Sequence, residues 1–389
     1  MIKTERSKFS LIMTVAAVAA GLVLRLSYPL DIEFKADERW TFEQVRAALS
    51  GGSWLWSGMP TSIGGLNPGA SFWVFIPLGW LFGADTPPQL ARGVQCMNSA
   101  ALIALALFAL RSVRENDREP WFWAAALWAV NPVAVILERK IWPPSVLPLF
   151  TVAIIAAWWG RRANIGSFLF ALLSVLAAQI HLSVAFFAAA LAIWSLADDR
   201  QSLRIMPFVA GAALGLLPAV PWILEWTGGL SSTWRLPIFH FWPKWLTQPF
   251  GFGFDYTLGA AQFGEFLTMP ILGGTRTYLV ALLHVWLAAL AIYLYWHAGR
   301  SILMLGSPSL RTAILGSDSA GLLVHSTLIG YGILLTLLTI RGAGLHRHYL
   351  VVAAPIMALW VARLALFADG GLLRATGRLA LAGLCVGGA

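Results

Sequence analysis

The feature that most constrains this chain is a series of apolar runs, each about 20 residues long, that recurs along its whole length. A run of that length crosses the hydrocarbon core of a bilayer as an α-helix, whereas the strands of a transmembrane barrel are about half as long. Charged residues make up only 12% of the chain, about half the share found in soluble domains. The sequence therefore predicts an all-α, polytopic membrane protein with a single membrane domain over residues 1–389.

About eleven transmembrane helices are expected, because short polar connections separate that many apolar runs. Their predicted ranges are 9–30, 88–110, 120–137, 145–160, 167–181, 183–197, 205–224, 277–297, 319–340, 349–367 and 379 onward. The first run follows three basic residues, as in a signal peptide, but it continues to Leu30 without a small-residue cleavage site. This pattern predicts a retained first helix.

Basic residues set the expected orientation, because short cytoplasmic loops carry an excess of lysine and arginine. They gather in alternate connections, at Arg111, Arg114 and Arg118, at Arg161 and Arg162, at Arg200 and Arg204, at Arg300 and Arg311, and at Arg374 and Arg378. The protein is therefore expected in the inner (plasma) membrane, with two long segments outside, residues 31–87 and 225–276. The net charge of +9 forms no contiguous basic stripe, which argues against nucleic-acid binding.

The first outer segment contains DERWTFEQVRAAL, whose apolar residues recur near helical spacing. This spacing predicts an amphipathic helix along the membrane surface, ended by Gly51 and Gly52. The apolar stretch 71–83 is too short to cross a bilayer and is expected to lie at the interface or to re-enter it. The second outer segment is rich in tryptophan and phenylalanine, which suits a position at headgroup level beside a lipid substrate.

Acidic residues crowd the expected outer side, where a charge kept beside the bilayer is a functional candidate. Asp37 and Glu38 open the amphipathic helix, and adjacent side chains point apart, so we expect them to have different tasks. One carboxylate would accept a proton, and the other would hold a metal ion or a hydrogen bond. The structural alternative is a helix N-terminus, where acids are favoured and Asp37 would serve as the N-cap.

Residues 37–83, DERWTFEQVRAALSGGSWLWSGMPTSIGGLNPGASFWVFIPLGWLFG, resemble the first outer loop of the C-type glycosyltransferases. They are closest to the branch that includes protein O-mannosyltransferases and the aminoarabinose transferase of lipid A. The matching pieces, in order, are Asp37-Glu38, Gly51-Gly52-Ser53-Trp54, Leu81-Phe82-Gly83 and Arg92. Looser similarities are ERKIW (138–142) and HRHYLVVAAP (346–355). The chain departs from the family at Leu66-Asn67-Pro68, where a lysine that contacts the lipid phosphate is frequent.

The resemblance implies an enzyme that transfers a sugar from a polyprenyl-phosphate-linked donor to a glycan, lipid or protein acceptor outside the cell. Asp37 would be the base of an inverting displacement, and Glu38 would orient the acceptor or hold a divalent cation. The phosphate would bind to three cations, Arg139, Lys140 and Arg347. Further candidates for the active site are Glu138, His181, His346 and His348. The sequence defines no metal and no cofactor.

Two other functions remain as alternatives. A transporter or flippase of a lipid-linked glycan would show charges in the middle of helices and inverted repeats with broken helices. The nearest such charges are Arg25, His325 and Arg363. An O-antigen polymerase or ligase would also use a lipid-linked donor, but it would place a basic catalytic loop late in the chain.

Overall fold

The computed structural model describes residues 2–61, 65–225, 234–253, 264, 265, 268, 270–272, 275–305, 318–367 and 371–389. Helices account for 77% of the described residues, which confirms the all-α class. The strands within the described ranges form two antiparallel hairpins, β1 (Ser57–Pro60) with β2 (Leu66–Pro68) and β3 (Pro270–Leu272) with β4 (Thr275–Arg276). Much of the expected second outer segment, including Asp255, lies outside the described residues.

Among the described helices, six stretches are long and apolar enough to cross a membrane, fewer than the eleven expected. They are Phe9–Leu26 in α1 (Ile2–Leu26), α5 (Pro87–Ser112), Ile205–Leu224 over α11 (Ile205–Leu216) and α12 (Val220–Leu224), Leu279–Arg300 in α16 (Leu279–Leu305), Ser319–Thr339 over α18 (Ser319–His325) and α19 (Gly332–Thr339), and Arg347–Leu366 over η6 (Arg347–Ala353) and α20 (Ala354–Leu366). The shorter helices with apolar sequences include α8 (Leu147–Trp159), α9 (Asn164–Ile180) and α10 (Ser183–Asp198). The last helix is α21 (Gly371–Gly388).

The expected helix 120–137 is two helices, α6 (Arg118–Val130) and α7 (Pro132–Leu137). Pro132 lacks the N–H that would continue the ladder of α6, so it begins the second helix instead. The Asn131 side chain caps that second helix by accepting the N–H of Ala134 at 3.0 Å. The expected helix 319–340 is one stretch of helix, in which the π-helical turn η5 (Ser326–Tyr331) joins α18 to α19.

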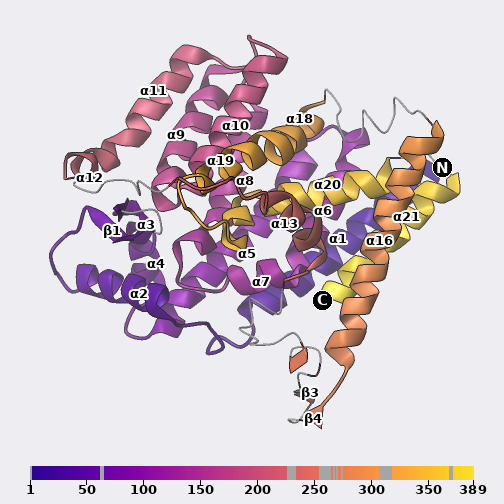
Figure 1. The fold of residues 1–389 in the computed structure, drawn as a ribbon, viewed down its shortest axis with the longest axis horizontal. Coiled ribbons are helices and arrows are strands. Elements are labelled where there is room, and N and C mark those ends of the chain that lie inside the picture. Colours follow the sequence, from indigo (N-terminus) through magenta and orange to yellow (C-terminus); the bar gives the residue numbers. More distant parts are fainter. Residues whose placement is uncertain are drawn as a thin grey trace.

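The first outer segment folds as a small helical layer. The predicted amphipathic helix is present as α2 (Ala36–Leu49), and Gly51 follows it with a φ of +79°. The stretch 71–83 forms α3 (Ala70–Trp73) and α4 (Ile76–Phe82). α2 packs closely on α4, because a Cβ at Gly79 would lie 2.7 Å from a methyl group of Leu49. Figure 1 shows this layer at the lower left, beneath β1.

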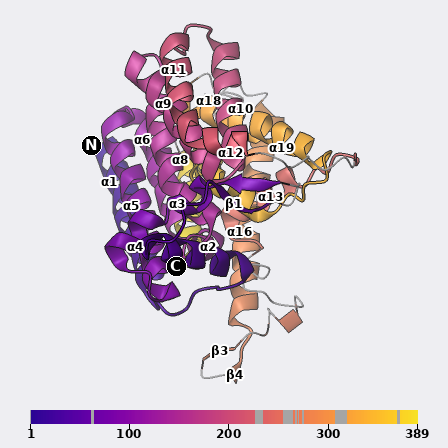
Figure 2. The ribbon, with the colours of Figure 1, turned by 90° about the vertical axis from the view of Figure 1, so that its left-hand side faces the viewer.

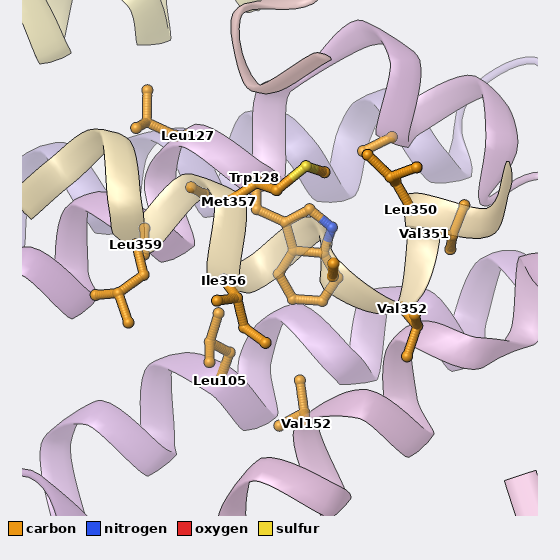
Figure 3. Packing of buried hydrophobic residues seen from close by; sticks show 14 of the residues in the cluster. Leu105, Leu127, Trp128, Val152, Leu350, Val351, Val352, Ile356, Met357 and Leu359 are labelled. Atoms are coloured by element: carbon orange, nitrogen blue, oxygen red, sulfur yellow. The ribbon is translucent and has the colours of Figure 1, made fainter. Parts of the chain in front are cut away.

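The core centres on α6, which lies between α1 and α20 (Figure 1). Every side chain from Trp121 to Val130 is buried, as expected for a helix that is apolar on all faces. In Figure 3, Trp128 is surrounded by Leu105 of α5, Val152 of α8 and residues of η6 and α20. The larger surface helices surround this centre, with α9, α10 and α11 gathered in one group and α16 with α21 in another (Figures 1 and 2).

A buried ion pair lies beside this core. The Arg25 guanidinium donates to Glu138 Oε2 at 2.6 and 2.9 Å, and Trp128 Nε1 donates to Glu138 Oε1 at 2.8 Å. Arg25 and Glu138 are fully buried. The Asn98 amide donates to the carbonyl oxygens of Glu138 and Ser145, both at 2.7 Å. These contacts join the ends of α1 and α6 and the middle of α5 to residues 138–145.

We expect Arg25→Met to lower the free energy of unfolding by about 3–5 kcal/mol, because it leaves the Glu138 carboxylate buried without its cation. The double variant Arg25→Met with Glu138→Leu should recover most of that loss, since no buried charge remains. Reversible unfolding in mixed micelles measures both values. Arg363→Met is the matched control: it breaks the pair with the exposed Asp318, which should cost below about 1 kcal/mol. Equal losses in the single and double variants would contradict the expectation.

Candidate active site at the α2 end of the bundle

Four segments that are far apart in the sequence meet at the end of the bundle that carries α2. They bring together Asp37 of α2, Lys140 and Trp142 after α7, His181 between α9 and α10, and His346, Arg347, His348 and Tyr349 around the start of η6. Five of the residues predicted for the site, Asp37, Lys140, His181, His346 and His348, therefore lie in one connected group of contacts.

Trp142 links the acid to the histidines. Its Nε1 donates to Asp37 Oδ2 at 3.2 Å, and its ring lies edge-on to His348 with 4.6 Å between ring centroids. Lys140 Nζ lies 5.2 Å from the centroid of the same ring, within the range of a cation–π contact. The sequence indicates Trp142 only as the aromatic residue of ERKIW, and its role as the link depends on the tertiary contact.

The three histidines form a cluster of rings with Tyr349, in which His346 and Tyr349 stack on His348 and His181 lies edge-on to it. The His348 ring lies 5.5 Å from His181, 5.6 Å from His346 and 4.8 Å from Tyr349, measured between centroids. The backbone N–H of Ser183 donates to His181 Nδ1 at 3.3 Å, so the proton of the neutral ring is on Nε2. Burial lowers the pKa of His181 to about 4. His181 is therefore a neutral hydrogen-bond donor at physiological pH.

Cations approach the site in two groups. Lys140 Nζ pairs with Glu33, and burial lowers the pKa of Lys140 to about 8. The Arg347 guanidinium packs against the backbone of Gly253, in the place that a Cβ would need. Burial and the charge of Arg347 lower the pKa of Lys244, which lies in α13 (Phe241–Thr247). Arg347 and Lys244 are thus neighbouring cations, and no pattern in the sequence indicated Lys244.

Two predicted residues lie away from this group and have structural contacts. Arg139 donates to the carbonyl oxygens of Leu24, Ser27 and Tyr28 at 2.8–2.9 Å. These acceptors are at the C-terminal end of α1, where a cation is favoured. Glu138 forms the buried ion pair with Arg25. Neither side chain is brought to Asp37.

Asp37 and Glu38, although adjacent, lie in different environments. Glu38 is buried and accepts the backbone N–H of Lys35 at 3.0 Å, so it closes the first turn of α2. Burial raises the pKa of the Glu38 carboxyl. The N-cap residue is Lys35, so the assignment of Asp37 as the N-cap is wrong. Asp37 is exposed and meets Trp142.

In the part of the chain that the structure describes, no three His, Cys, Asp or Glu side chains form a group that would hold a metal ion. No protein-family model, no curated protein sequence and no solved structure matches the chain. The fold and the site together define a helical membrane protein in which the exposed carboxylate of Asp37, neighbouring cations and a neutral histidine lie at one end of the bundle.

Substitutions in the acidic pair should separate structural from chemical roles. Glu38→Ala should lower the free energy of unfolding by about 1 kcal/mol, because the N–H of Lys35 loses its acceptor. Glu38→Gln should retain most of that stability, since the amide oxygen still accepts. Asp37→Ala is the control and should change stability little, because Asp37 is exposed. Thermal unfolding in detergent measures all three, and a larger loss in Asp37→Ala than in Glu38→Ala would contradict these assignments.

Proposed function

We propose that this protein is a membrane glycosyltransferase that moves a sugar from a polyprenyl-phosphate-linked donor to an acceptor hydroxyl. One observation carries the proposal. The exposed carboxylate of Asp37 heads the segment that resembles the C-type enzymes, and Trp142 joins it to a group of cations and histidines. A carboxylate beside cations suits a reaction in which a hydroxyl loses its proton and a phosphate leaves.

The reaction has one covalent step. The acceptor oxygen attacks the anomeric carbon of the sugar while Asp37 takes the proton from that oxygen. The bond between the sugar and the phosphate oxygen breaks, and its electron pair leaves with the lipid phosphate. Direct displacement inverts the anomeric carbon. The Trp142 N–H holds the carboxylate at 3.2 Å in one orientation.

The lipid phosphate carries the negative charge of the leaving group, so its stabilisation needs cations. Lys140 Nζ lies over the Trp142 ring, and Arg347 lies between His346 and His348 in the sequence. Lys244 joins Arg347 in this role. Arg139 is not included, because its donors meet the end of α1. His181 Nε2–H supplies a neutral donor for a hydroxyl of the sugar.

The same proposal fixes the orientation. The N-terminus then lies in the cytoplasm, and the α2 end faces the outer side of the plasma (inner) membrane. This orientation agrees with the arginine-rich connections at the opposite end of the bundle. At that opposite end, Arg162 pairs with Asp199, and Glu119 pairs with Arg374 and Arg378. A donor on a lipid carrier would then approach Asp37 from the outer leaflet.

The proposal predicts that Asp37→Asn lowers kcat by about a hundredfold or more, the usual value of a general base. Asparagine keeps the size of the side chain and an acceptor for Trp142 but cannot take a proton. Transfer of labelled sugar by the purified protein from a polyprenyl-phosphate donor measures the effect. Glu43→Gln is the matched control, because Glu43 is an exposed acid on the same helix. Unchanged turnover in Asp37→Asn would overturn the assignment of the base.

The pKa of Lys140 predicts a pH dependence. The ammonium group is charged below its pKa of about 8 and neutral above it, so binding of the phosphate should be strong below pH 8 and weaken above it. We expect kcat/KM to fall as the pH rises through about 8, because kcat/KM reports the groups of the free enzyme. Lys140→Arg should shift that fall to higher pH, since a guanidinium stays charged. The same alkaline fall in both proteins would exclude Lys140 as its source.

A further inference from the structure

Residues 27–35 connect α1 to α2 and bring the carboxylate of Glu33 to the cations of the candidate site. Glu33 pairs with two ammonium groups, those of Lys140 and Lys35. Lys140 lies over the Trp142 ring, and it is one of the cations that would hold the lipid phosphate in the transfer reaction. The role inferred for Glu33 therefore rests on the proposed function.

The connection is held firmly at its α1 end. Arg139 donates to the carbonyl oxygens of Ser27 and Tyr28, both at 2.8 Å, and Arg92 donates to that of Leu26 at 2.6 Å. Tyr28 has a φ of +52°, in the left-handed region that side chains other than glycine seldom adopt. These hydrogen bonds keep the backbone in that conformation, so the start of the connection is fixed.

The part of the connection that carries Glu33 has few restraints. Within the described chain, no main-chain hydrogen bond is made by residues 32–34. The Phe34 ring lies edge-on to Phe42 of α2, with 6.1 Å between ring centroids. The other polar contacts of this part are the ion pairs of Glu33. A change in the position of the Glu33 side chain would therefore break few contacts.

Lys140 requires an anion, because its side chain is only 9% exposed and a buried ammonium group is costly without a counter-charge. Among the described residues, Glu33 supplies the carboxylate that pairs with it. A carboxylate thus occupies, in the free protein, the cation to which the phosphate of the sugar donor would bind.

The two partners of Glu33 differ in exposure. The Lys35 side chain is 70% exposed, whereas that of Lys140 is nearly buried. A lipid phosphate on Lys140 would repel the Glu33 carboxylate and would itself neutralise the buried ammonium group. Glu33 could then leave Lys140 and remain paired with Lys35 in water. The pair of lysines therefore offers the carboxylate a position inside the site and one outside it.

We propose that Glu33 is a displaceable latch on the phosphate site. Its carboxylate pairs with Lys140 when no sugar donor is bound, and it gives way when the lipid phosphate arrives. Because the carboxylate and the phosphate compete for one cation, Glu33 weakens the binding of both the sugar donor and the lipid phosphate product. Its return to Lys140 displaces that product and prepares the site for the next sugar donor.

Binding of farnesyl phosphate, a short isoprenyl phosphate, tests the latch without any transfer reaction. Calorimetry with the purified full chain in micelles, at a pH below the pKa of Lys140 of about 8, measures Kd. Glu33→Gln should bind about tenfold more tightly, because removing the competing state raises the population that can bind. The matched control Asp31→Asn neutralises an exposed acid of the same connection and should change Kd by less than about twofold.

The direction of the change is decisive. If Glu33 only kept Lys140 charged, Glu33→Gln would bind the phosphate more weakly, and equal or weaker binding overturns the proposal. Lys140→Met should bind farnesyl phosphate weakly whether or not Glu33→Gln is also present, since both groups would act through the same ammonium. A tenfold gain from Glu33→Gln in the Lys140→Met background would also overturn it.

A second measurement uses the wild-type protein and does not depend on the folding of a variant. A carbodiimide joins a carboxylate to an amine that it contacts, so it should link Glu33 to Lys140, and mass spectrometry detects tryptic peptide 26–35 joined to the peptide that begins at Lys140. Saturating farnesyl phosphate should remove most of this cross-link, and farnesol should not. Modification of the exposed Glu43 in the same digest controls for loss of reagent. An unchanged yield would contradict displacement.

These measurements separate the latch from the enzyme activity. A gain in phosphate binding by Glu33→Gln in a protein that transfers no sugar would retain the latch and reject the transfer reaction. Sugar transfer by a protein whose affinity for farnesyl phosphate does not respond to Glu33→Gln would reject the latch alone.

Discussion

The arrangement of the site depends on the buried pair of Arg25 and Glu138. Removing two charges from water is costly, and the cost is offset here because the carboxylate accepts from both Arg25 and Trp128. The pair fixes the point where the chain leaves α7, and Asn98 holds the next turn through two carbonyl oxygens. Lys140 and Trp142 follow within four residues of Glu138, so their positions are set by a contact that itself takes no part in chemistry.

Much of the fold could be predicted from the apolar runs, since each predicted range overlaps a helix. Within the described residues, fewer helices are long and apolar enough to cross a membrane than the sequence predicted. Asn131 and Pro132 divide one run, and three other runs form the shorter helices α8, α9 and α10, of 13, 17 and 16 residues. Proline gives a local signal that could have been used for the interruption.

The candidate site could be predicted in part, from charges and imidazoles at the expected outer ends of helices. Asp37, Lys140, His181, His346 and His348 are brought together in this way. The sequence could not separate Asp37 from Glu38, because their difference depends on which side of α2 is buried. It also could not show that Arg139 meets carbonyl oxygens of α1, or that Lys244 approaches Arg347. Both contacts are between residues about 100 positions apart in the sequence.

The half-buried imidazole of His181 has a consequence for the pH dependence of the site. An ordinary histidine changes its charge between pH 5 and 8. With a pKa of about 4, His181 keeps the same charge across that range. A fall in pH within the range would therefore leave this imidazole neutral, and the site would not respond to pH through it.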